Sequence, residues 1–134
     1  LGPNRTALNP DELITRIRFD SDAHHKKGFI KFGLRKAMAI SLVSVAVSLR
    51  METNRIAEAT VAFGAVARNP IRAHYVEANL VGKHLSEESL AEAARIAEWE
   101  VNPISDIRAS AEYRRHLSGV LFRRAVKLAV KEES

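Results

Sequence analysis

The residues best suited to metal binding or acid–base chemistry are five histidines, of which only two are adjacent. His24 and His25 follow one another, so their side chains diverge in a strand or in a helix and make a poor chelate. No spacing links a serine nucleophile to a histidine base, and the G-x-S-x-G turn of many hydrolases is absent. The lack of cysteine also removes thiolate metal sites and cysteine nucleophiles. We therefore predict solvated loop histidines, no metal site and no catalytic residues.

The stretch from Ala23 to Met51 is the second candidate for chemistry, because it holds six basic residues and no acid. It predicts either a site for an anion or a solvated basic edge of the fold. Gly64 has no second glycine nearby, so phosphate-binding loops of the GxGxxG or Walker type are missing. A lone glycine in a strand instead marks a position that another backbone or a ligand approaches closely.

Length and composition limit the fold to one domain, since the chain has 134 residues, of which 46% are hydrophobic. The longest uncharged run, Ala37 to Leu49, is well short of the roughly 20 apolar residues that a membrane helix needs. The first residues show no secretory signal pattern. These features predict a soluble, cytoplasmic protein that does not bind membranes. The net charge of +5 leaves open a basic module that binds nucleic acid or an acidic partner, although only 6% of the residues are aromatic and could stack on bases.

Alternation of apolar and polar residues predicts four strands, at Glu12 to Phe19, Phe29 to Leu34, Ile40 to Leu49 and Arg55 to Val66. In the third of these, one face carries large residues and the other carries Ser44, Ala46 and Ser48. We expect this small face to pack closely against another layer. A polar turn at residues 52–54 predicts a hairpin between the third and fourth strands.

After Pro70 the period changes to about 3.6, which indicates a short helix ending at Gly82 and two longer helices capped by Ser86 and Ser110. The helix after Ser86 is acidic and the last helix is basic, so we expect the two to pack together. Trp99 is expected to anchor the core. Strands followed by helices predict an α+β fold, with an antiparallel sheet of three to four strands packed against about three helices.

Three stretches, in order along the chain, resemble one protein family. They are residues 31–41 (KFGLRKAMAIS), residues 62–73 (AFGAVARNPIRA) and residues 103–115 (PISDIRASAEYRR). Together they resemble the C-terminal domain of the FAD-binding (medium) subunit of the xanthine dehydrogenase and carbon monoxide dehydrogenase family of molybdenum hydroxylases. The first residues of the chain resemble the last strand region of that subunit's FAD-binding domain. The resemblance implies that residues 1–24 are the C-terminal edge of the FAD-binding domain and a linker, and that residues 25–134 are the CO dehydrogenase flavoprotein C-terminal domain.

The resemblance also implies cofactors, partners and roles. In this family a molybdenum–pterin centre hydroxylates the substrate, and electrons pass through iron–sulfur clusters to FAD and then to an acceptor. The implied partners are the N-terminal FAD-binding domain and the molybdenum and iron–sulfur subunits. Lys31 matches a lysine that contacts the flavin, and Ile14 matches an aliphatic residue that packs on the flavin ring. The loop from Arg35 to Ile40 matches a segment that gates access to the flavin, with Ala39 where many relatives have an acid.

The functional prediction is therefore a domain without catalytic residues of its own, which closes the FAD pocket in a multi-subunit oxidoreductase. The resemblance implies packing roles for Arg108, Tyr113, Arg114 and Arg115, and we expect buried or interfacial ion pairs between these arginines and Asp106 or Glu112. Alone, the chain is expected to bind FAD weakly or not at all, and a homodimer is one expected outcome of the surface left exposed. The alternative is the free-standing basic module, whose binding would depend steeply on salt.

Overall fold

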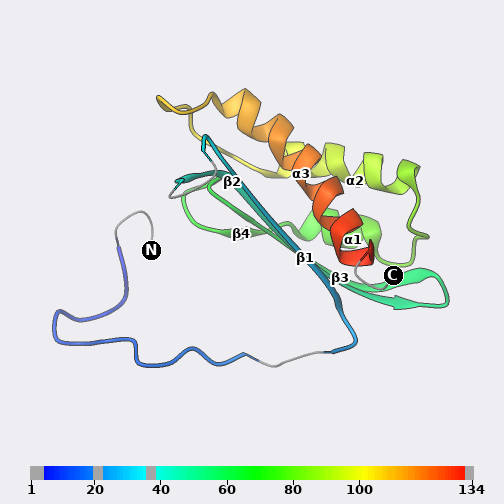
Figure 1. Ribbon diagram of the computed structural model, residues 1–134, viewed down its shortest axis with the longest axis horizontal. Helices are drawn as coiled ribbons and strands as arrows, with labels where there is room; N and C mark the ends of the chain where they lie inside the picture. The colour runs from blue at the N-terminus through cyan, green and yellow to red at the C-terminus, as the bar shows by residue number, and fades with distance from the viewer. Residues whose placement is uncertain (1–4, 20–22, 36–38, 132–134) are drawn as a thin grey trace.

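The structure is a computed structural model that describes residues 5–19, 23–35 and 39–131. Figure 1 shows one antiparallel sheet with helices against it and an extended N-terminal segment that runs away from both. The strands are β1 (Lys26–Gly33), β2 (Ser41–Glu52), β3 (Arg55–Gly64) and β4 (Ile71–Arg72), in the order β1-β2-β3-β4. The helices are α1 (His74–Leu80), α2 (Glu87–Glu100) and α3 (Ala111–Lys131). The predicted α+β class, with a four-stranded sheet and three helices, is confirmed.

The hairpin between β2 and β3 forms at the predicted polar turn. Thr53 and Asn54 join the strands with φ values of 46° and 64°. Two consecutive residues in the left-handed region give a turn whose twist matches that of the flanking strands. This turn pairs Met51 with Ile56, and a register shift between Arg50 and Met51 then places Ala46 opposite Ala62 and Val45 opposite Phe63.

The large residues of the central strands point toward the helices. Val43, Val45, Val47 and Leu49 of β2 are buried together with Val61 and Phe63 of β3. The helices α2 and α3 complete this core with Leu90, Ala97, Leu121, Phe122 and Val126. A Cβ atom on Gly28 would collide with the backbone carbonyl of Ala125, so glycine at this position lets α3 lie directly on β1. One face of the sheet is thereby covered by helices.

The helix starts follow the predicted caps. The Ser86 hydroxyl accepts a hydrogen bond from the Ser89 N–H, and the Ser86 N–H donates to the Ser89 hydroxyl, which makes a reciprocal capping box. The Ser110 hydroxyl accepts from the Tyr113 N–H at the start of α3. Glu87 of α2 pairs with Arg123 and Lys127 of α3, so the expected packing of an acidic against a basic helix is also confirmed.

The predicted strand at Glu12 to Phe19 is wrong for the described part of the chain. These residues are extended but form no strand, and their side chains are exposed, including Ile17 at 81% and Phe19 at 86%. Alternation produces a strand only where a neighbouring strand supplies hydrogen bonds and a layer covers the apolar face, and nothing within residues 5–19, 23–35 and 39–131 does so here. The fourth strand of the sheet is instead the two-residue β4, which the sequence did not indicate.

Trp99 is not in the core, contrary to the prediction. It is 69% exposed on the outer side of α2 and meets Tyr75 of α1 edge to face, with ring centroids 5.4 Å apart. The helical period explains the error, because the buried stripe of α2 runs through Leu90, Ala93, Ala94 and Ala97 and leaves position 99 on the opposite side.

Candidate functional site

The candidate site lies on the sheet face opposite the helices. Three rows of residues cross β1, β2 and β3 on this side, and we call them together the open face: Lys27–Ser48–Thr60, Phe29–Ala46–Ala62 and Lys31–Ser44–Gly64. Most of these side chains are small. The open face is the predicted small-residue face, yet no segment that the structure describes covers it.

The centre of the open face is hollowed and apolar. A shallow depression of about 390 Å³ is lined there by residues of all three strands, with Phe29 on one side and Ala46, Thr60 and Ala62 on the other. Phe29 is 61% exposed although it lies in the middle of a strand. Apolar surface of this kind on a well-ordered sheet marks a place for another molecule or domain.

Lys31 stands at one end of the open face. It lies opposite Ser44, which lies opposite Gly64. A Cβ atom on Gly64 would come within 2.5 Å of the Ser44 hydroxyl oxygen, so the missing side chain keeps this row flat. Within the described residues Lys31 is exposed and forms no ion pair, which leaves its ammonium group available to a ligand on this face.

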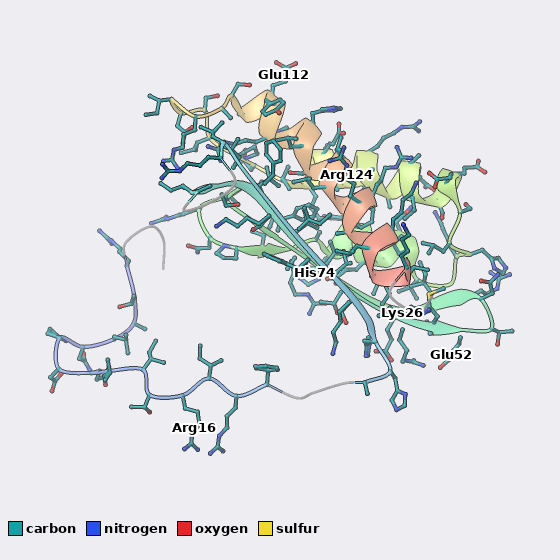
Figure 2. The ribbon with its side chains drawn as sticks, viewed as in Figure 1. Arg16, Lys26, Glu52, His74, Glu112 and Arg124 are labelled. Atoms are coloured by element: carbon teal, nitrogen blue, oxygen red, sulfur yellow. The ribbon has the colours of Figure 1, made fainter. Side chains whose placement is uncertain are left out.

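Ile14 and Lys31, the two predicted flavin contacts, are not brought together. Ile14 is 62% exposed on the segment 5–19, which Figure 2 shows at Arg16 to run far from the sheet. The predicted gating loop is described only at its ends, because residues 36–38 lie outside the described residues. Leu34, Arg35, Ala39 and Ile40 line a second hollow of about 280 Å³ together with Arg108.

Arg114 is a structural residue that the sequence indicated only in part. Its side chain is 4% exposed, and its guanidinium donates to the carbonyls of Leu42 and Ala65 and to the Asp106 carboxylate. The ion pair with Asp106 was predicted, but the two carbonyl contacts were not, since they join residues 72 and 49 positions apart. Arg114 thus ties the start of β2 and the end of β3 to the loop before α3.

Asp106 accepts the hydrogen bonds that close that loop. One carboxylate oxygen accepts from the N–H groups of Arg108 and Ala109 and from Arg114. The Arg108 N–H, followed by the Arg114 guanidinium, holds the pKa of Asp106 below its usual range, and this outweighs the opposing effect of burial. The end of the sheet that carries Lys31 and Gly64 is therefore held by a fixed network.

Glu77 is a buried carboxylate at the other edge of the sheet. It accepts from the Val61 N–H at 2.8 Å and from both Nε and an Nη of Arg72 at 3.0 and 2.8 Å. Burial raises the pKa of Glu77, but the Arg72 guanidinium and the Val61 N–H together lower it below the ordinary value. The charged carboxylate of Glu77 therefore joins α1 to the β3–β4 edge of the sheet through these hydrogen bonds.

Several basic residues are buried or paired with acids within the described part of the chain. Arg114 is buried, Arg50 pairs with Glu58 and Glu52, and Arg123 and Lys127 pair with Glu87. These contacts within the chain weaken the alternative of a free-standing basic module. No cluster of His, Asp or Glu that could hold a metal ion occurs in residues 5–19, 23–35 and 39–131. No helix in the same ranges has the length and apolar character to cross a bilayer.

The fold and the open face define an α+β domain with a sheet surface that none of the described segments covers. The family model for the CO dehydrogenase flavoprotein C-terminal domain matches residues 29–129. The chain belongs to this family, as the resemblance predicted.

Known relatives agree with this assignment. The chain is 35% identical to the glyceraldehyde dehydrogenase medium chain of Sulfolobus acidocaldarius, over 94% of this chain and 44% of the relative. It is 29% identical to the xanthine dehydrogenase FAD-binding subunit of Escherichia coli, over 96% of this chain and 45% of the relative. The solved structure of reconstituted CO dehydrogenase from Oligotropha carboxidovorans matches with a TM-score of 0.86 and 35% identity, over 96% of this chain and 45% of that chain. The chain thus spans less than half the length of these relatives.

Proposed function

We propose that this domain completes the flavin pocket of an FAD-binding subunit in a molybdenum hydroxylase, with Lys31 as its contact to the flavin. The observation that carries the proposal is the row Lys31–Ser44–Gly64, where an exposed lysine without an ion pair in the described chain borders a flat strip of sheet. The relatives named as medium chains and FAD-binding subunits support the cofactor. The partners we propose are the N-terminal FAD-binding domain and the molybdenum and iron–sulfur subunits, which carry the molybdopterin and the iron–sulfur clusters.

The residues of the open face fit a planar, partly anionic ring. Gly64 and Ser44 place no bulky side chain over the strip, so an aromatic edge can approach the backbone. The Lys31 ammonium can donate to the pyrimidine edge of a flavin and favour its reduced, negatively charged form. FAD, when bound, supplies the redox chemistry that passes electrons from the iron–sulfur clusters to an acceptor.

The proposal also gives a role to Ile14, which lies on the extended segment 5–19. We propose that residues 1–24 form the C-terminal edge of the preceding FAD-binding domain and a linker, and that residues 25–134 form the domain proper. The exposed aliphatic residues of 12–19 then pack within the preceding domain, where Ile14 covers one side of the flavin ring and excludes water. The extended course of this segment away from the sheet supports that division.

Flavin titration tests the proposal. FAD is added to this chain and, separately, to this chain mixed with the N-terminal domain of the subunit, and flavin fluorescence is followed. We expect no binding by the chain alone, because the residues 5–19, 23–35 and 39–131 offer a wall and no enclosing phosphate site. We expect the chain to tighten FAD binding by the N-terminal domain.

Two outcomes contradict this account. Tight binding of FAD by the chain alone would mean that it carries a complete flavin site. An N-terminal domain whose affinity for FAD is the same with and without the chain would mean that this domain has no part in the pocket.

A further inference from the structure

We propose that Arg114 is a positioning residue for the flavin contact, and that it acts by holding β2 and β3 at the point where they separate, beside the row Lys31–Ser44–Gly64. This inference rests on the proposed function and adds to it the residue that sets the position of the flavin ring relative to the Lys31 ammonium. The left-handed backbone at Ala65 is the second part of the same arrangement.

The strands β2 and β3 separate directly beyond this row. The pair of Ser44 with Gly64 is the last one between them, whereas β2 continues beside β1 as far as the pair of Ser41 with Gly33. A register shift leaves Leu42 without an opposite residue in either register of the described strands. Such bulges redirect a strand and are common next to functional sites.

Arg114 bridges the gap that the separating strands leave. Its Nη1 lies 2.8 Å from the Leu42 carbonyl oxygen and 3.2 Å from the Ala65 carbonyl oxygen, and its Nη2 lies 2.9 Å from the Asp106 carboxylate. A guanidinium presents its donors in a rigid planar fork, so these three acceptors are held in fixed relative positions. Because the side chain is only 4% exposed, Arg114 lies within the fold and does not itself reach a ligand on the open face.

Ala65 shows that the end of β3 is held in an unfavourable conformation. It follows Gly64, the last residue of β3, and its φ is 63°. A residue with a Cβ atom adopts this left-handed region at a cost, and it does so where the surrounding contacts enforce it. Here Arg114 binds the Ala65 carbonyl, and the next residue, Val66, is fully buried and accepts from the Asn102 N–H at 3.0 Å. The turn leaves Ala65 exposed at the end of the row.

The position of a ring on this row depends on the spacing of the three strands. Lys31, Ser44 and Gly64 lie on neighbouring strands, which are about 4.8 Å apart in a regular sheet. A shift of the start of β2 or the end of β3 therefore moves a ring that lies on Ser44 and Gly64 relative to the Lys31 ammonium. Because the interaction between charges weakens with distance, we expect the flavin potential to depend on Arg114 through Lys31.

Two substitutions in the full-length subunit test this role. Ala65→Val places a β-branched residue where φ is positive, which it strongly disfavours, and the exposed site has room for the larger side chain. Ala65→Gly is the matched control, because glycine keeps the left-handed conformation without cost. Arg114→Lys retains the charge but loses the planar fork, and Arg115→Lys is its exposed control. Each subunit is tested for bound FAD, and its flavin is titrated potentiometrically.

We expect Ala65→Val and Arg114→Lys to lower the ratio of reduced to oxidised flavin at a fixed potential by at least about threefold, and to have no further effect when Lys31 is also replaced by alanine, because residues that act through one contact are not additive. Ala65→Gly and Arg115→Lys should keep the parent ratio. A parent ratio in Arg114→Lys, or a shift of equal size with and without Lys31, would overturn the proposal. If the Arg114→Lys subunit does not retain FAD, Ala65→Val decides by the same two criteria.

The Lys31→Ala subunit separates this inference from the proposed function. A flavin that does not respond to Lys31→Ala removes the proposed contact, and the positioning role of Arg114 fails with it. A flavin that responds to Lys31→Ala but not to Ala65→Val or Arg114→Lys keeps the contact and removes only the positioning role.

Discussion

The two faces of this sheet carry opposite kinds of side chain on the same strands. On the helical face Val43, Val45 and Val47 are buried against α2 and α3. On the open face Ser44, Ala46 and Ser48 leave a hollow that no described segment fills. The helical face supplies the stability of the isolated domain, whereas the open face adds little to it. The same strands therefore build a buried core on one side and a surface of mostly small residues on the other.

The largest loss of stability is expected from a substitution on the helical face. Phe122 is fully buried between α3 and the sheet, so Phe122→Ala removes a core side chain and leaves a cavity. We expect the free energy of unfolding to fall by about 3 to 5 kcal/mol, measured by urea denaturation. A loss below about 1 kcal/mol would show that the packing of the helices on the sheet contributes less to stability than the contrast between the two faces requires.

The next effect concerns the network at the Lys31 end of the sheet. Arg114→Met keeps the apolar stem but leaves the carbonyls of Leu42 and Ala65 and the Asp106 carboxylate without their donor. We expect destabilisation by about 3 kcal/mol in the same denaturation assay. Arg115→Met is the control, because Arg115 is exposed and its contact to Asn102 is 3.5 Å long, and it should change stability by less than about 0.5 kcal/mol. Similar losses for both variants would contradict the role of the buried arginine.

The third prediction concerns pH at the β3–β4 edge. The pKa of Glu77 is lower in the folded chain than the value of about 4.3 expected when unfolded, because the effects of Arg72 and Val61 outweigh that of burial. The stabilisation is therefore complete above the unfolded pKa and is lost as the pH falls through the folded value. Urea midpoints should drop between neutral pH and pH about 3, and Glu77→Gln should make this drop shallower.

The control for this test is Glu88→Gln, which changes an exposed carboxylate in the first turn of α2. At neutral pH it should change the free energy of unfolding by less than about 0.5 kcal/mol. An unchanged slope in Glu77→Gln would show that the buried carboxylate is not the group that responds.

The smallest expected effect is on the open face. Phe29→Ser removes an aromatic side chain as large as that of Phe122, but one that is already mostly in water. In the isolated chain we expect a change within about 0.5 kcal/mol. A loss as large as that of Phe122→Ala would mean that the open face is part of the core and would end the contrast between the two faces.

Local signals in the sequence predicted most of the fold. Ser86 and Ser110 marked two helix starts, and residues 52–54 marked the hairpin, because caps and tight turns depend on a few adjacent residues. The small residues at 44, 46 and 48 also marked the open face. The sequence could not show that no described segment covers this face, because alternation within a strand does not reveal which other segment packs on it.

The errors arise where tertiary partners decide. Residues 12–19 have a strand pattern but no strand to pair with in the described chain. Trp99 was assigned to the core by residue type, and the helical phase of α2 places it outside. The carbonyl contacts of Arg114 could not be predicted, because they depend on which segments, far apart in sequence, lie close together in the fold.

The central claim is that Lys31 on the open face contacts the flavin, and the reduction potential of the flavin tests it most directly. Potentiometric titration of the full-length subunit is compared for the parent, Lys31→Ala and Lys131→Ala, which removes an exposed lysine at the end of α3. We expect a more negative potential in Lys31→Ala, because the ammonium that stabilises the reduced anionic flavin is lost, and the parent value in Lys131→Ala. Equal potentials in all three proteins would contradict the account.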